Sequence, residues 1–125
     1  MSKSEMTLPG LSSAERKSLQ KELDSDSINF QEVAVPNATF GEPTTIIALI
    51  YLTSSVLFTI SLWLARKVRF QESSYELSVK DANGGEKKLT IRSKQSETET
   101  QKEIIGEVGK ALGMDVTAVL ARVQK

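Results

Sequence analysis

The chain has 125 residues, and its 16 basic and 16 acidic side chains leave no formal net charge. It contains no cysteine and no histidine, which excludes disulfides, thiol nucleophiles, cysteine metal sites and the commonest general base. A chain of this length has room for one small domain. The charge is uneven, because residues 1–65 hold four basic and seven acidic residues, whereas residues 66–125 hold twelve and nine.

Residues 1–43 are predicted to form a mostly disordered N-terminal tail with one short helix. Ser12 and Glu15 match a capping box, in which each side chain accepts a backbone N–H at the helix start, so we expect a helix near 13–23. Its few apolar residues leave two interpretations: a helix that is marginal alone, or one that docks on a partner. The rest of the tail is predicted to be a linker, because a proline and a glycine interrupt it.

The stretch from Thr44 to Ala65 carries no charged residue, and Arg66, Lys67 and Arg69 follow it closely. As a helix, these 22 residues reach about 33 Å, the thickness of a bilayer's hydrocarbon core. The alternative is a buried helix of a globular domain, which needs apolar faces elsewhere to surround it, and the rest of the chain offers few. We therefore predict one transmembrane helix over residues 44–66.

Seven serine and threonine side chains lie within this predicted span, and they have two interpretations. Serine and threonine bond back to the carbonyls of their own helix, which requires no further role. Alternatively, Ala48, Ser55 and Thr59 fall on one side of the helix and form a small-residue contact with another helix. No ionisable residue lies inside the span, which disfavours a proton or ion pathway.

The side chains after the span predict its orientation. Trp63, Arg66, Lys67 and Arg69 are expected at the membrane interface, with residues 67–74 as a basic juxtamembrane linker. Because basic residues next to a span stay in the cytoplasm, we expect the N-terminus outside and the C-terminal part in the cytoplasm. Membrane lipids are then partners of the chain, since a basic patch at the membrane face suits anionic headgroups.

A β-hairpin is predicted after residue 75. Apolar residues alternate with polar ones on both sides of a turn signal, Asn83-Gly84-Gly85. A two-residue turn would place apolar residues opposite polar ones. We therefore predict a three-residue loop, Asn83-Gly84-Gly85, with Gly85 in the positive-φ conformation. In this register Val79 is opposite Leu89, and Leu77 is opposite Ile91.

Two helices are predicted to follow the hairpin. Ser96 and Glu99 form a second capping box, and the apolar stripe of the helix ends near Leu112, where Gly113 is placed as a left-handed cap. Asp115 is expected to cap a short last helix. Residues 75–125 then form a ββαα module whose two open sheet edges invite a partner strand or a second copy of the chain.

The predicted fold class is a single-pass α-helical membrane protein with a small α+β (ββαα) C-terminal module. The acidic residues of this module recur along a solvated helix face, so we assign no catalytic, cofactor-binding or metal-ligating residue and expect no enzyme activity. We expect no small-molecule substrate, and no nucleic acid either, because net charge and exposed aromatic residues are both low.

The preferred functional hypothesis is therefore a membrane-anchored accessory or adaptor subunit that binds a protein partner or forms a homo-oligomer. The alternative is a membrane-tethered enzyme or nucleic-acid-binding module.

Overall fold

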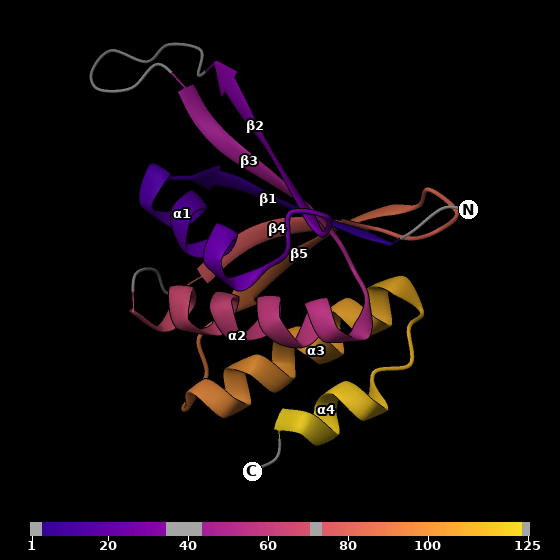
Figure 1. Cartoon of the computed structure of the whole chain (residues 1–125). Helices are drawn as coiled ribbons and strands as arrows, with labels where there is room; N and C mark the ends of the chain where they lie inside the picture. Colours follow the sequence, from indigo (N-terminus) through magenta and orange to yellow (C-terminus); the bar gives the residue numbers. More distant parts are fainter. Residues whose placement is uncertain (1–3, 35–43, 71–73, 124–125) are drawn as a thin grey trace.

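The computed structural model describes residues 4–34, 44–70 and 74–123. Figure 1 shows these residues as one antiparallel sheet packed against helices. The strands are β1 (Glu5–Leu11), β2 (Ile28–Ala34), β3 (Thr44–Tyr51), β4 (Ser74–Lys80) and β5 (Glu86–Arg92). The helices are α1 (Ser13–Glu22), α2 (Ser54–Phe70), α3 (Glu97–Leu112) and α4 (Thr117–Val123).

The sheet has the strand order β2-β3-β1-β4-β5, and every pairing is antiparallel. The N-terminal strand β1 is therefore central, with β3 on one side and β4 on the other. Met6 is opposite Ile50 on β3 and Val79 on β4. Because β1 joins the two halves of the sheet, the C-terminal hairpin is part of a larger sheet rather than a separate two-stranded unit.

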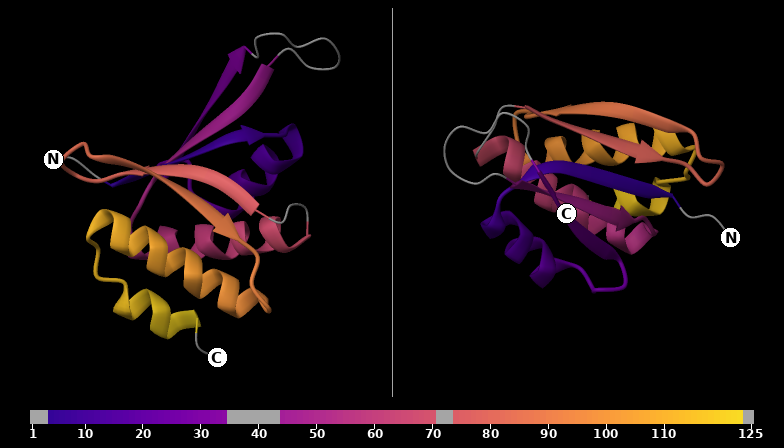
Figure 2. Two further views of the ribbon diagram at one scale, coloured as in Figure 1. Left: turned by 180° about the vertical axis from the view of Figure 1, so that it is seen from behind. Right: turned by 90° about the horizontal axis from the view of Figure 1, so that it is seen from above.

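The described helices lie on one side of the sheet (Figures 1 and 2). The alternation of burial along the strands agrees with this arrangement, since Tyr75, Leu77 and Val79 on β4 are buried whereas Glu76 between them is exposed. Helix α2 packs against α3, and α4 contacts both of them on the side away from the sheet (Figure 1). The core fills the space between the sheet and α1, α2 and α3.

The N-terminal segment contradicts the prediction of a disordered tail. Met6 and Leu8 on β1 are completely buried, and β2 occupies much of the predicted linker. The predicted short helix exists as α1, and its Ser12–Glu15 capping box is confirmed. The proline and glycine that suggested the linker fall within residues 35–43, outside the described residues.

The predicted span is divided into two elements, the strand β3 and the helix α2, so the predicted transmembrane helix is wrong. Thr53 breaks the run, because its hydroxyl accepts the backbone N–H of Val56 (3.3 Å) and its carbonyl accepts that of Leu57 (2.8 Å). The residues before this break are rich in β-branched side chains and pair with β1 and β2 on either side. Residues 67–70, predicted as a linker, form the last turn of α2.

The predicted membrane topology, with the N-terminus outside and the C-terminal module in the cytoplasm, is overturned by the same finding. Among the residues that the structure describes, no helix is both long enough and apolar enough to cross a bilayer. The single-pass fold class is accordingly replaced by an α+β domain with a five-stranded antiparallel sheet.

The β4–β5 hairpin has the predicted faces but a different register. Leu77 is opposite Leu89, and Tyr75 is opposite Ile91, two residues away from the predicted pairing. The loop is Ala82–Gly84, and Gly84 rather than Gly85 has the positive φ, at 91°. A shift of two residues leaves the apolar face intact, which is why alternation alone could not distinguish the two registers.

The side chain of Asp81 explains this register. Its Oδ1 accepts the backbone N–H groups of Asn83 (2.9 Å) and Gly85 (2.8 Å), and its backbone N–H donates to the carbonyl of Gly85 (2.9 Å). Asp81 therefore occupies the first position of the turn, a position that aspartate favours for this reason. The shift also places Glu86 opposite Lys80, in place of the unfavourable Lys80–Lys88 pair of the predicted register.

The C-terminal helices begin and end close to their predicted positions. The Ser96 hydroxyl accepts the Glu99 N–H (3.1 Å), and Gly113 ends α3 with a φ of 67°. Gly109 allows α4 to fold back, because a β-carbon there would lie 2.7 Å from a methyl carbon of Val116. Asp115 accepts the N–H of Thr117 at the start of α4.

Candidate binding groove

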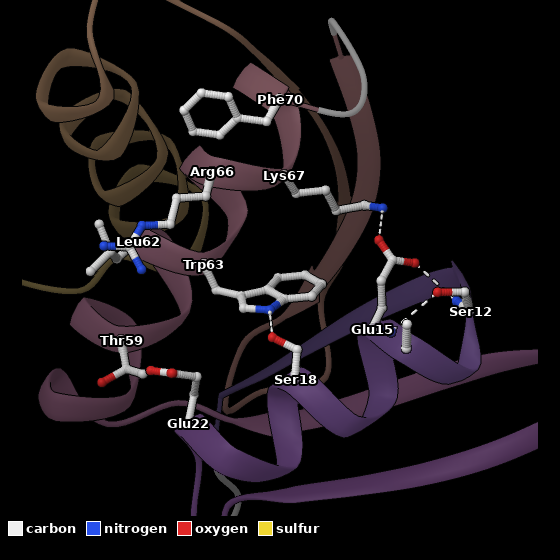
Figure 3. A pocket seen from close by; sticks show the side chains of 11 residues that line it. Ser12, Glu15, Ser18, Glu22, Thr59, Leu62, Trp63, Arg66, Lys67 and Phe70 are labelled. Atoms are coloured by element: carbon white, nitrogen blue, oxygen red, sulfur yellow. Dashed lines mark hydrogen bonds and ion pairs between the residues drawn. The ribbon is translucent and has the colours of Figure 1, made fainter.

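The four residues predicted at a membrane interface instead connect α2 to its neighbours within the domain. Trp63 and Lys67 project towards α1, as Figure 3 shows, whereas Arg66 and Arg69 reach the segment around the start of α3. A single helix thus uses an aromatic and basic cluster to hold elements on both of its sides. The same residue types suit a membrane interface, so the sequence pattern does not separate these two roles.

The contacts between α2 and α1 are polar and partly buried. The indole Nε1–H of Trp63 donates to the hydroxyl of Ser18 (3.0 Å), and the ammonium of Lys67 forms an ion pair with Glu15. Glu15 also accepts the backbone N–H of Ser12 (2.9 Å) through its other carboxylate oxygen. One carboxylate therefore completes the capping box of α1 and fixes α1 against α2.

Lys67 lies in an unusually enclosed place for a lysine, with a side chain that is 4% exposed. Its Nζ lies 4.9 Å from the centre of the Tyr75 ring on β4, which adds a cation–π contact to the ion pair with Glu15. The Tyr75 hydroxyl in turn donates to the carbonyl of Pro9 on β1. These contacts connect α1, α2 and the centre of the sheet around a single positive charge.

The contacts of α2 with the α3 side are more exposed. Arg66 pairs with Glu97 (2.9 Å), but their side chains are 58% and 37% exposed, so water screens the attraction and the pair contributes little stability. Arg69 donates to the carbonyl of Lys94 (2.7 Å). Deeper in the α2–α3 contact, the buried Gln101 side chain donates to the hydroxyl of Ser61 (3.1 Å).

A groove of about 340 Å³ lies between α1 and α2. Leu62 and Trp63 supply its apolar surface, and Phe70 stands at its rim with 74% of its surface exposed. Figure 3 shows Glu22 at the opposite end of the groove from Phe70 and Arg66. The groove therefore combines an apolar middle with one basic and one acidic end.

The remaining predicted site residues are scattered. Ala48 is buried on β3, Ser55 is exposed in the first turn of α2, and Thr59 lines the groove, so these three do not form one small-residue helix face. Asn83, Gly84 and Gly85 lie in or beside the hairpin loop and are exposed, at a turn as predicted.

Within the described residues, no group of three or more His, Cys, Asp or Glu side chains is placed to hold a metal ion. The pKa of Asp115 is lowered because its carboxylate accepts the backbone N–H and then the hydroxyl of Thr117. That carboxylate lies at the start of α4, outside the groove.

A scan against protein-family models, a search of curated proteins and a search of solved structures each find no match to this chain.

Sequence reasoning missed the α1 side of the groove, formed by Glu15 and Ser18. Glu15 was assigned only to the capping box, and Ser18 carried no signal of its own. The sequence did leave open whether the helix near 13–23 is marginal alone or docks on another surface. In the structure the helix docks on its own domain: Leu19 is completely buried in the core, and Ser18 and Glu15 contact side chains of α2.

Proposed function

We propose that the chain is a protein-interaction domain of an accessory or adaptor subunit, and that it binds a partner's apolar anchor residue in the groove between α1 and α2. The exposure of Phe70 beside Leu62 and Trp63 carries this proposal. Large exposed apolar side chains next to a groove are typical of recognition sites, and aromatic residues supply much of the binding energy at such sites.

Charge at the two ends of the groove defines the partner further. Arg66, whose ion pair with Glu97 is exposed, favours an acidic residue of the partner near Phe70. Glu22 at the other end favours a basic residue. The expected ligand is a short amphipathic segment with an apolar anchor between the two charges, docked in the manner of a helix in a groove.

Site-specific photocrosslinking tests this function. A photoreactive phenylalanine analogue replaces Phe70 in one variant of the full chain and Val33 in a control. Val33 is the matched control because it is the other large exposed apolar residue among those described, at 38%, and lies on β2. We expect a discrete protein adduct from position 70 and none from position 33.

A binding measurement then decides whether the adduct reflects the groove. A synthetic peptide that covers the crosslinked segment should bind the unmodified chain, and Phe70→Ser should weaken that binding by about tenfold or more. Val33→Ser should leave it unchanged. Equal binding by both variants, or identical adducts from both positions, would refute the proposed site.

A further inference from the structure

The strand β5 ends the sheet, and no described strand pairs with its outer edge. Figure 2 shows β5 at one margin of the sheet, with β2 at the other. We propose that a second copy of this chain pairs with β5 in an antiparallel manner, about a two-fold axis that passes beside Leu89. The product is a dimer with one continuous sheet, and it does not involve the α1–α2 groove.

The backbone of β5 suits this pairing. The hydrogen bond from Asp81 N–H to the Gly85 carbonyl marks a closely bonded pair, and bonded and non-bonded pairs alternate along an antiparallel ladder. Lys88 and Thr90 therefore direct their N–H and C=O groups away from β4, towards the free edge. A two-fold axis beside Leu89 pairs Lys88 with Thr90 of the second copy, so the outward groups meet each other.

Charge selects this register over its neighbours. With the axis at Leu89, Glu86 faces Arg92 of the second copy, and the symmetry repeats this opposite-charge pair. Moving the axis to Lys88 would bring two lysines face to face, and moving it to Thr90 would place Lys88 opposite Arg92. Like charges directly opposite each other destabilise a sheet, so only the Leu89 register avoids them among these three.

The charges within one copy continue this pattern. On the face of the sheet away from the helices, Glu5 on β1 is opposite Lys80 on β4, and Lys80 is opposite Glu86 on β5. Arg92 of the second copy would extend this row of alternating charges by one strand. Glu86 and Arg92 are both exposed, so they are accessible to the second copy.

The helix-covered face of the sheet would also continue from one copy into the other across the paired β5 strands. Leu89, which is only partly buried, would meet Leu89 of the second copy, and Lys87 would lie opposite the apolar Ile91. Lysines on an edge strand usually discourage unwanted pairing. Here Lys88 disfavours the two neighbouring registers, in which it would face a like charge, and permits this one.

Sedimentation of full-chain variants with reversed charges tests the proposed dimer. The unmodified protein should dimerise, and Glu86→Arg should raise the dimer dissociation constant by about tenfold or more, because it sets two positive side chains opposite each other at both symmetry-related pairs. The double variant Glu86→Arg with Arg92→Glu restores both opposite-charge pairs, so its dissociation constant should return close to the original. Circular dichroism verifies that each variant is folded.

Disulfide formation tests the position of the axis. Because the chain has no cysteine, Leu89→Cys introduces a single thiol, which should form an intermolecular disulfide on mild oxidation. Lys87→Cys is the control, since the two positions 87 lie four residues apart along the paired strands and should not bridge. A folded chain that remains monomeric at about 100 μM, a dimer insensitive to Glu86→Arg, or preferential bridging at position 87 would each overturn the proposal.

Discussion

Lys67 is a buried charge that connects α1 to the rest of the domain. It is enclosed between Glu15 on α1 and the ring of Tyr75 on β4. A buried charge is tolerated only when it is paired, so removing one partner costs more free energy than the pair contributes.

Glu15→Gln should lower the free energy of unfolding by about 1–3 kcal/mol, because it removes a negative charge that pairs with the buried Lys67 ammonium. Glutamine retains the capping box of α1, since either side chain can accept the Ser12 N–H. Urea denaturation measures the loss. The double variant Glu15→Gln with Lys67→Met should recover much of the lost free energy of unfolding. If the loss in the double variant equals the sum of the losses in the two single variants, the two side chains are not coupled.

The carboxylate of Asp115 predicts a pH effect at the start of α4. Its pKa is lowered by the backbone N–H and the hydroxyl of Thr117, so the charged form is favoured in the folded chain. A lowered folded-state pKa stabilises the chain above the ordinary aspartate pKa, and that contribution is lost as pH falls through the lowered value. Asp115→Ala should therefore lower Tm at neutral pH, and the difference in Tm between the unmodified chain and the variant should become smaller in acid. A difference in Tm that is constant with pH would exclude this role.

At the scale of elements, sequence patterns predicted local structure such as helix caps better than they predicted which strands pair. The caps at Ser12, Ser96 and Gly113 are local and were identified correctly, although among the described contacts only Ser12 and Glu15 complete the predicted capping box. The run from Thr44 to Ala65 was misread because β3 is a central strand. Its inward side chains are buried and its outward Ile47 and Leu49 are partly buried, so it reads as continuously apolar rather than alternating.

The hairpin register has a direct test on the exposed face of the sheet. Glu76 is opposite Thr90, so replacing both by cysteine should give a disulfide in the folded chain. Ser78 with Thr90, the pair of the register predicted from the sequence, is the control and should bridge much more slowly, because its β-carbons are diagonal neighbours. Faster bridging of the control pair would mean that Asp81 does not set the turn.

At the scale of the whole molecule, the missing information was long-range. Nothing in the first ten residues shows that Met6 and Leu8 pair with β3, or that Met6 also pairs with β4, because sequence distance conceals such contacts. When β1 is not recognised as a strand, the C-terminal hairpin has no neighbouring strand. The apolar run of residues 44–65 then has no apolar faces around it. The groove was missed for the same reason, since it forms only when α1 and α2 meet.

The central claim is that residues 44–70 form a strand and a helix of one five-stranded domain. NMR of the full chain, in buffer and again with lipid bicelles, tests it most directly. We predict extended chemical shifts for Thr44–Tyr51, helical shifts for Ser54–Phe70, and cross-strand contacts that join Met6 to Ile50 in both conditions. Continuous helical shifts from Thr44 to Ala65, without those contacts, would contradict the account.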